Sequence, residues 1–459
     1  MASYDYDVIV IGSGASGLVA ARLLAKGGKT VAVVENSKVG GTCPHEACIP
    51  TKALLESAHL YHHAKHAEGM GLRSSLLSFN YPRIRAWKNV AIKKTRVGDT
   101  ETSLIAAGIN VIHGSAHFIN SETITVGRAR FSARSYIIAS GATPIRPAIP
   151  GLSSSDTLTY PEALELSRPP RSIAIVGGGA VGVEFASIFG SFGSKVYLLE
   201  KGAHLLPHEE AEVGKILAEN LRKRYGVITV TRAHLQTGAR RGYKKQLIIK
   251  AAGKLHAIVV DDILFTVGKA PNTDIGLENA NVQYTPQGIL VDAQLKTTAK
   301  HIFAVGDVLG GPQSTHLASY QGRIAAHNLL HPKKRVSVDY RAIPRTVFSS
   351  PEAAMVGLSS EEIKAERIKT LSAQVPLSAV SRSYLAPEES GFVKLAADKH
   401  TGKLVSASIV APHASEIIHE LTLAINNGLR AEDVAKTQHA FPTWSEAVRL
   451  AATKLSKNI

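Results

Sequence analysis

A glycine pattern that occurs twice constrains the fold of this chain more than any other feature. A strand-like run, residues 6–11, leads into Gly12-x-Gly14-x-x-Gly17, a helical pattern follows, and a second apolar run ends at Glu35. This order is typical of a dinucleotide-binding βαβ unit, whereas an isolated glycine turn would be a weak signal. The first glycine makes the turn, the second lets a pyrophosphate approach the backbone, and the third lets helix and strand pack closely.

The same unit recurs 165 residues further along the chain. Its residues are Gly177, Gly179, Gly182 and, after its second strand, Glu200. Two such units predict two dinucleotides, one a fixed FAD and the other an exchanging nicotinamide dinucleotide. A carboxylate at the position of Glu200 repels the 2′-phosphate of NADP(H). We therefore expect NAD(H), while Lys201 and His204 nearby leave NADP(H) as the less favoured alternative.

The chain has two cysteines, Cys43 and Cys48, with Pro44 between them. Residues five apart in a regular helix have Cα atoms about 8–9 Å apart, whereas a disulfide requires less than about 7 Å. We therefore expect Cys43 at a loop-to-helix junction, Cys48 about one turn into the helix, and a kink at Pro50. A redox-active pair, activated as thiolate by the helix start, is favoured over two unpaired core residues.

Composition narrows the functional classes. The 459 residues carry a formal net charge of +16, but the basic residues are scattered, and no aromatic-rich nucleic-acid motif accompanies them. A solvated surface that is simply basic is favoured over attraction of an anionic substrate or an acidic partner protein, and we expect no nucleic-acid partner. No apolar run reaches the length of a membrane span, and residues 1–7 do not resemble a signal peptide. We therefore expect a cytoplasmic protein that does not contact a membrane.

A histidine-rich helix is expected over residues 53–66. Four of its side chains share one face: His59, His62, His63 and His66. A packed or solvated helix face is favoured over a metal site, so no metal is expected.

The rest of the chain completes an α/β fold with two Rossmann-like domains and an α+β C-terminal domain. We expect an FAD-binding domain (1–150), an NAD(P)-binding domain (151–272), a return to the FAD-binding domain (273–338) and an interface domain (339–459). Strands are expected to stop at glycine turns, at Gly141 and Gly268. Asp307 follows another strand, where it suits a flavin ribityl hydroxyl or serves as a simple turn residue. One helical stretch is expected over 79–107.

With these residues in view, the chain resembles the flavin-dependent pyridine nucleotide–disulfide oxidoreductases over essentially its whole length. Within that family it is most similar to the dihydrolipoamide dehydrogenases, with glutathione and mercuric reductases as relatives. The resemblance rests on these segments: Gly12–Gly17, Gly40–Lys52, Ile138–Gly141, Gly177–Glu184, Val267–Asn272, Ala304–Asp307 and Pro442–Glu446. It implies an enzyme that moves electrons between nicotinamide, FAD and a Cys43–Cys48 disulfide, and that acts on a small-molecule disulfide or dithiol.

The resemblance also implies roles for individual residues. FAD would lie across Gly12, Gly14, Gly17, Glu35, Gly41, Thr42, Lys52, Gly141 and Asp307. NAD(H) would dock at Gly177, Gly179, Gly182 and Glu200, and Gly268 is a further cofactor-binding candidate. Cys48 would contact the flavin and Cys43 would exchange with the substrate. Lys52 and Glu184 would pair beside the flavin; alternatively Glu184, expected two residues into its helix, complements the helix dipole. The C-terminal domain would close a homodimer in which each active site takes residues from both chains.

Two departures from the family pattern concern proton transfer. Members that act on thiols usually carry His before the Pro-Thr of the last motif, but this chain has Phe441 there, while the orienting Glu446 remains. Phe cannot accept the proton that thiol–disulfide exchange releases. His439, two positions earlier, is a candidate replacement base. His45 stands between the cysteines, where Asn is usual, and is a candidate for tuning Cys43.

Three functions follow from these residues. The first is a dihydrolipoamide dehydrogenase-like enzyme with altered proton handling. The second is a reductase whose acceptor needs no protein base, such as a metal ion or a quinone, although the C-terminal cysteine pair of mercuric reductases is absent. The third is a flavoprotein subunit that binds a partner complex and turns over little, and the intact cysteine pair argues against it.

Overall fold

The structure, a computed structural model, describes residues 4–73, 77–95, 100–386, 388 and 390–459. The chain forms two compact units. The first contains residues 1–53, 86–145 and 268–338, and the second contains residues 54–85, 146–267 and 339–459. Both units therefore combine segments that are far apart in the sequence.

A parallel sheet forms the centre of the first unit. Its strands are β1 (Tyr6–Ile11), β2 (Val31–Glu35), β3 (Ile109–His113), β6 (Ala129–Ile138) and β18 (Ile302–Ala304), in the order β3-β2-β1-β6 with β18 also beside β6. The side chains of β1 alternate between two cores, since Val8 and Val10 pack in one while Ile9 and Ile11 pack in the other. Burial on both faces explains why this strand reads as a continuous apolar run.

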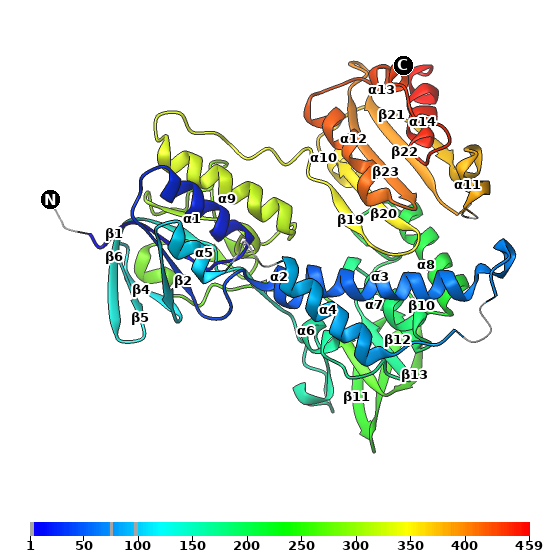
Figure 1. The fold of residues 1–459 in the computed structure, drawn as a ribbon, viewed down its shortest axis with the longest axis horizontal. Helices are drawn as coiled ribbons and strands as arrows, with labels where there is room; N and C mark the ends of the chain where they lie inside the picture. The colour runs from blue at the N-terminus through cyan, green and yellow to red at the C-terminus, as the bar shows by residue number, and fades with distance from the viewer. Residues whose placement is uncertain (1–3, 74–76, 96–99, 387, 389) are drawn as a thin grey trace. The chain divides into compact units, whose positions relative to one another are not determined.

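Two helices cover one face of this sheet. Helices α1 (Ala15–Lys26) and α9 (Thr315–Leu330) lie side by side (Figure 1), and their apolar residues, such as Leu18 and Ala325, share a core with Val8. Helix α1 follows β1, and α9 follows β18 and the short helix η4 (Gly306–Leu309). Because β1 and β18 both run parallel to β6, their carboxyl ends lie at the same edge of the sheet, where open α/β sheets bind ligands.

Smaller elements complete the first unit. Strands β4 (Ala116–Asn120) and β5 (Thr123–Val126) extend β6, β7 (Ala142–Pro144) pairs with β15 (Lys269–Pro271), and β16 (Tyr284–Thr285) pairs with β17 (Gly288–Ile289). The remaining helices are α2 (Thr42–Glu46), α5 (Glu101–Ala106) and η3 (Leu277–Ala280). Helices α3 (Cys48–Lys65) and α4 (Tyr81–Thr95) contribute residues to both units.

The second unit contains a second parallel sheet, in the order β10-β9-β8-β14. Its elements are β8 (Ser172–Val176), α7 (Ala180–Ser191), β9 (Lys195–Leu199), α8 (Ala211–Tyr225), β10 (Ile228–Val230) and β14 (Asp262–Phe265). The second unit also contains η1 (Ala67–Met70), η2 (Ser154–Asp156) and α6 (Tyr160–Leu164). A three-stranded antiparallel sheet, β11 (His234–Arg241), β12 (Lys244–Ala251) and β13 (Lys254–Val260), shares a hydrophobic core with it.

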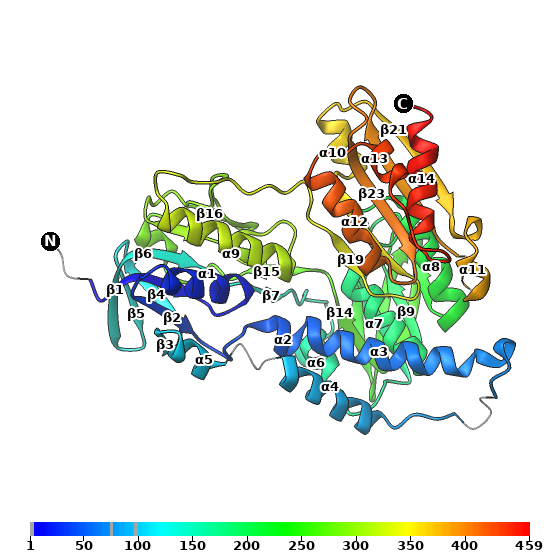
Figure 2. The ribbon, with the colours of Figure 1, turned by 45° about the horizontal axis from the view of Figure 1, so that its top comes forward.

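An antiparallel five-stranded sheet forms the C-terminal part of this unit, in the order β19-β20-β23-β22-β21. Its strands are β19 (Arg345–Val347), β20 (Glu352–Gly357), β21 (Thr370–Pro376), β22 (Phe392–Asp398) and β23 (Leu404–Ala411). Helices α12 (Ala414–Asn426) and α14 (Glu446–Ser456) share one hydrophobic core with the sheet (Figure 2). The shorter helices are α10 (Ser360–Ala365), η5 (Leu377–Ala379), α11 (Arg382–Leu385) and α13 (Ala431–Lys436).

The predicted fold class, two Rossmann-like sheets and an α+β C-terminal part, is confirmed, but two local predictions are wrong. Helix α2 ends at Glu46, and Cys48 begins a new helix instead of lying one turn into the first. The break is at Ala47, with φ −134° and ψ −96°, and not at Pro50. Pro50 lies in the first turn of α3, where a proline is tolerated because its missing N–H has no partner inside the helix.

The expected helical stretch over 79–107 is two helices, α4 and α5. Helix α5 has its own N-cap at Thr100, whose Oγ1 accepts a hydrogen bond from the Ser103 N–H at 3.3 Å. None of the helices that the structure describes is long and apolar enough to cross a membrane.

Candidate active site and family

Cys43 and Cys48 lie at two consecutive helix starts in the first unit. Cys43 is the second residue of α2, and Cys48 is the first residue of α3. The helix break at Ala47 lets the two side chains approach within hydrogen-bond distance, whereas a continuous helix would hold them apart. The prediction that the two cysteines do not share a regular helix is therefore confirmed.

The contact between the two thiols makes them unequal. A hydrogen bond with Cys48, together with burial, raises the pKa of the Cys43 thiol far above its ordinary value, while Thr315 and Lys52 act in the opposite direction. The Sγ atom of Cys48 lies 3.4 Å from the Oγ1 atom of Thr315. In the reduced pair, Cys43 therefore holds its proton tightly.

Thr315 is a site residue that sequence analysis missed. It is the first residue of α9, and the hydroxyl of the preceding Ser314 accepts a hydrogen bond from the Leu317 N–H at 3.4 Å. A serine before a helical pattern is an N-cap signal. That signal predicts a helix start at this point in the sequence, but not that it reaches the cysteines.

The side chain of His45 contacts the loop that precedes α2. Its Nε2 atom lies 3.0 Å from the carbonyl oxygen of Val39, so this nitrogen carries a hydrogen. The side chain thereby fastens α2 to the preceding loop. Whether it also tunes Cys43 stays a prediction.

Each glycine of the first turn meets a different physical requirement. Gly12 has φ +101°, and a Cβ atom there would lie 2.3 Å from the carbonyl oxygen of Ala139. A Cβ atom on Gly17 would lie 2.0 Å from the carbonyl oxygen of Gly12, whereas none on Gly14 would meet any atom within 4 Å. Gly14 thus leaves open space at the N-terminus of α1, as a pyrophosphate requires. The second turn repeats the pattern at Gly177, Gly179 and Gly182.

The acidic residues of the two repeats are held by equivalent hydrogen bonds. The carboxylate of Glu35 accepts the N–H groups of Ser13 at 2.9 Å and Ser37 at 2.8 Å. The carboxylate of Glu200 accepts the N–H groups of Gly178 at 2.7 Å and Gly202 at 2.5 Å. The donors are related by the same 165-residue offset, and both carboxylates are buried. Each carboxylate is therefore fixed beside its glycine turn, where it suits the ribose hydroxyls of a dinucleotide.

The other FAD-site candidates lie in the first unit. Gly41 has φ +71°, and a Cβ atom there would lie 2.6 Å from the Cα atom of Gly14, so the loop before Thr42 packs closely on the first glycine turn. Asp307 follows β18 and forms an ion pair with Lys269, the residue after Gly268. A ribityl hydroxyl bound to Asp307 would share the carboxylate with Lys269. Gly141, with φ +72°, has open space around its Cβ position.

Lys52 and Glu184 belong to different units, and their ion pair stays a prediction. Glu184 is the fifth residue of α7 and is 3% exposed, so the expectation that it lies two residues into the helix is wrong, because α7 begins at Ala180. Its Oε1 atom accepts a hydrogen bond from the Phe348 N–H at 3.1 Å. A buried carboxylate deeper in the helix is a weaker complement to the helix dipole than a first-turn acid.

The two candidate residues near the C-terminus, His439 and Glu446, have different partners. The Nε2 atom of His439 lies 3.0 Å from the carboxylate of Glu420, its Nδ1 atom lies 3.0 Å from the carbonyl oxygen of Thr437, and its side chain is 4% exposed. Glu446 instead accepts the Thr443 N–H at 3.2 Å. Among the residues that the structure describes, no hydrogen bond or ion pair joins His439 to Glu446. Both ring nitrogens of His439 are thus engaged, which argues against a role as a free base.

Two family models match the chain. The model of the pyridine nucleotide-disulphide oxidoreductases matches residues 6–322, and the model of the dimerisation domain of the same family matches residues 343–452. The second match supports the predicted homodimer.

Similar proteins match over nearly the whole chain. A dihydrolipoyl dehydrogenase of Geobacillus stearothermophilus is 36% identical over 98% of this chain and 96% of its own length. A mercuric reductase of Staphylococcus aureus is 32% identical over 99% of this chain and 83% of its own length. The Cu(II) complex of the HOCl-induced flavoprotein disulfide reductase RclA from Escherichia coli is a similar solved structure, with a TM-score of 0.86 and 29% identity over 99% of this chain and 100% of that one.

The matches agree with the geometry of the two glycine turns and the cysteine pair. The predicted activity, a disulfide oxidoreductase, and the predicted cofactors, FAD and NAD(H), are confirmed. The chain therefore belongs to the pyridine nucleotide-disulphide oxidoreductase family.

Proposed function

We propose that this chain is an NADH-dependent enzyme of the dihydrolipoamide dehydrogenase type, in which Cys48 faces the flavin and Cys43 exchanges with the substrate. The observation that carries the proposal is the contact between the two thiols where α3 begins. When bound, FAD supplies the ring through which an electron pair passes between nicotinamide and sulfur. In the reducing direction, NADH and one proton give NAD⁺ while one sulfur–sulfur bond becomes two thiols. We place this homodimeric enzyme in the cytoplasm, where a close cysteine pair is more often catalytic than structural.

The roles of the two cysteines follow from their positions. Cys48 begins an 18-residue helix, and the positive helix end stabilises a thiolate there. Cys43 has a raised pKa because of its hydrogen bond with Cys48 and its burial. Thiolate, and not thiol, attacks a disulfide. Cys43 therefore needs a group that removes its proton before it can attack a substrate disulfide.

The cofactor sites are assigned to the two repeats. Gly12, Gly14, Gly17, Glu35, Gly41, Thr42, Lys52, Gly141 and Asp307 would hold FAD, and Gly177, Gly179, Gly182, Glu200 and Gly268 would hold the nicotinamide dinucleotide. The open Cβ positions of Gly14 and Gly179 give the pyrophosphates access to the starts of α1 and α7. Lys52 and Glu184 are proposed to pair beside the flavin.

A second function is favoured by the C-terminal motif. Phe441 is 74% exposed and stands where thiol-active relatives carry a base, while His439 is paired with Glu420. An acceptor that binds both sulfurs, such as a soft metal ion, or that takes electrons directly, such as a quinone, does not require this base. The similarity to a mercuric reductase and to the Cu(II) complex of RclA is consistent with such an acceptor.

A panel of acceptors with a base-restoring variant separates the two functions. The panel contains lipoamide, glutathione disulfide, Hg(II), Cu(II) and a quinone, each assayed by NADH oxidation. We expect lipoamide to be reduced slowly by the wild-type enzyme and about 10² to 10⁴ times faster by Phe441→His, since a positioned base contributes that much. Phe441→Tyr is the matched control, because its ring is similar but its hydroxyl is no base at neutral pH.

The outcomes of the panel are distinct. Brisk lipoamide turnover by the wild-type enzyme, with no gain in Phe441→His, would show that another group takes the proton of Cys43. Preferential turnover of a metal ion or quinone, unchanged in Phe441→His, would establish the second function in place of the first.

A further inference from the structure

One segment of the second unit carries most of the excess positive charge of the chain. Between Asn220 and Val260 there are ten lysines and arginines and no aspartate or glutamate. This segment includes the whole three-stranded sheet β11-β12-β13. Six of the ten lie on the sheet: Arg240, Arg241, Lys244, Lys245, Lys250 and Lys254.

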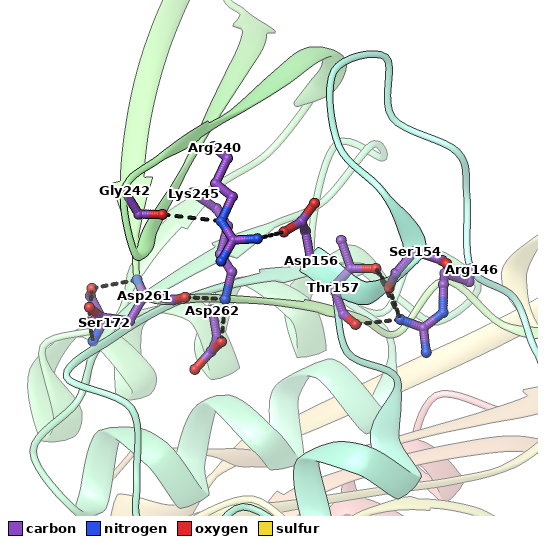
Figure 3. Close-up of polar contacts among 10 residues, drawn as sticks. All are labelled: Arg146, Ser154, Asp156, Thr157, Ser172, Arg240, Gly242, Lys245, Asp261 and Asp262. Carbon is purple, nitrogen blue, oxygen red and sulfur yellow. Dashed lines mark hydrogen bonds and ion pairs between the residues drawn. The ribbon is translucent and has the colours of Figure 1, made fainter.

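The inner face of this sheet is packed, and its two cations at the end of the β11–β12 hairpin are paired with carboxylates. Leu247 and Ile249 of β12 and Ile258 of β13 lie in the hydrophobic core. At the end of the β11–β12 hairpin, Arg240 and Lys245 are cross-strand partners. Figure 3 shows that both reach carboxylates: Arg240 lies 3.6 Å from Asp156, and Lys245 lies 2.6 Å from Asp262.

The opposite face of the sheet, which we call the outer face, differs from the inner face in its exposure and in the pairing of its charges. Side chains alternate along a strand, and cross-strand partners share a face, so the register assigns to it Arg241, Lys244, Ile248, Lys250, Leu255 and Val259. Leu255 is 68% exposed and Val259 is 45% exposed. No ion pair joins Arg241, Lys244 or Lys250 to any residue within the described ranges. The outer face is thus an aliphatic strip flanked by cations, of which Arg241 donates a hydrogen bond to the Gln246 Oε1 atom at 2.9 Å and Lys244 lies over the ring of Tyr243.

We propose that the outer face is a docking surface for an acidic protein segment that carries aliphatic side chains. A solvated sheet face normally alternates polar side chains outward, whereas this one exposes two aliphatic residues of β13. Carboxylates of a partner complement Lys244 and Lys250, and its aliphatic side chains cover Leu255 and Val259. Single-stranded nucleic acid is a poorer fit, because it requires several aromatic platforms in series, whereas the aromatic neighbour of the outer face is the single Tyr243 in the β11–β12 turn. The inference concerns a surface outside the redox site and does not rest on the proposed acceptor.

The test measures binding of a short fluorescein-labelled peptide of alternating glutamate and leucine to the full-length FAD-loaded enzyme by fluorescence anisotropy. We expect Lys244→Glu/Lys250→Glu to weaken binding at least about tenfold, and Leu255→Ser/Val259→Ser to weaken it by about the same factor. The matched control is Lys333→Glu/Lys334→Glu, an exposed pair in the other unit that changes net charge equally. It should change affinity less than about twofold, because these lysines are not part of the outer face.

Three results would overturn the proposal. The first is no binding of the peptide to the wild-type enzyme. The second is equal weakening by the control pair, which would reduce the effect to net charge. The third is tighter binding of single-stranded oligothymidylate or of phosphatidylglycerol vesicles that is lost in Lys244→Glu/Lys250→Glu, which would assign the outer face to a different partner. Unchanged NADH oxidation in all variants verifies that each one is folded.

Discussion

The two cysteines differ because of one backbone break. At Ala47 the chain leaves the first helix and starts the second, so that Cys48 occupies a helix start and Cys43 lies within hydrogen-bond distance of it. The helix dipole acts on Cys48, while hydrogen bonding and burial keep the proton on Cys43. The different roles proposed for the two sulfurs thus follow from the local positions of Cys43 and Cys48.

This division predicts different spectra for the two serine variants. During anaerobic titration with NADH, the wild-type enzyme should develop a long-wavelength absorbance band as its disulfide is reduced to give a thiolate at position 48. Cys43→Ser has no disulfide to reduce and should show the band before NADH is added, because its Cys48 is already free beside oxidised flavin. Cys48→Ser should lack the band. A band that survives in Cys48→Ser would reverse the two assignments.

Glu200 predicts a preference for NADH. Its carboxylate is fixed by Gly178 and Gly202 and should repel a 2′-phosphate. We expect kcat/KM for NADH to exceed that for NADPH at least about tenfold, and Glu200→Gln to reduce the ratio by about tenfold, or about 1.4 kcal/mol.

Glu35→Gln is the matched control for this experiment, since Glu35 is the equivalent residue of the first repeat. It should leave the NADH preference unchanged and increase FAD loss during dialysis. A wild-type enzyme that prefers NADPH would contradict the role given to Glu200.

At the scale of helices and strands, the sequence predicts those parts whose pattern is local. Strand β1 matches the expected run 6–11, because a strand buried on both faces is a continuous apolar run that ends at a turn. The sheet β11-β12-β13 was not predicted, since its pairing depends on contacts between strands and its outer face is partly apolar.

The redox site was predicted in part for the same reason. The glycine turns and the cysteine spacing are local patterns, and the structure shows the geometry that both predict. Three features depend on tertiary structure: the break at Ala47, the contact of Thr315 with Cys48 and the pairing of His439 with Glu420. A short stretch of sequence therefore does not predict them.

The packing of α3 predicts a loss of stability in acid. Burial and neighbouring cations lower the pKa of His62 to about 3, whereas an unfolded histidine titrates near pH 6.5. Between these values the unfolded state binds more protons, so the free energy of unfolding falls as the pH decreases below about 6.5, by up to about 1 kcal/mol per pH unit. Above that pH the imidazole is neutral in both states and contributes no pH dependence.

Urea unfolding of the wild-type protein and His62→Gln at about pH 7.5 and about pH 5.5 checks this prediction. The variant should lose about 1 kcal/mol less stability between the two conditions. His400→Gln, which removes an exposed histidine, should behave like the wild type. An identical loss in wild type and His62→Gln would show that His62 is not responsible.

At the scale of the whole molecule, the duplicated βαβ unit gives each compact unit its own glycine turn at the carboxyl end of a parallel sheet. The first unit also holds the cysteine pair, and the second holds the C-terminal part that matches the dimerisation domain. One chain thus contains the components for two dinucleotides and one reducible sulfur pair.

Whether reducing equivalents from NADH reach Cys43 and Cys48 is tested by alkylation under nitrogen, followed by peptide mass spectrometry. The oxidised, FAD-loaded enzyme is treated with iodoacetamide before and after one equivalent of NADH. We expect a Cys43–Cys48 disulfide and no label before NADH, and alkylation of the reduced cysteine pair after it. An enzyme whose flavin is bleached by NADH while the disulfide stays intact would contradict this expectation.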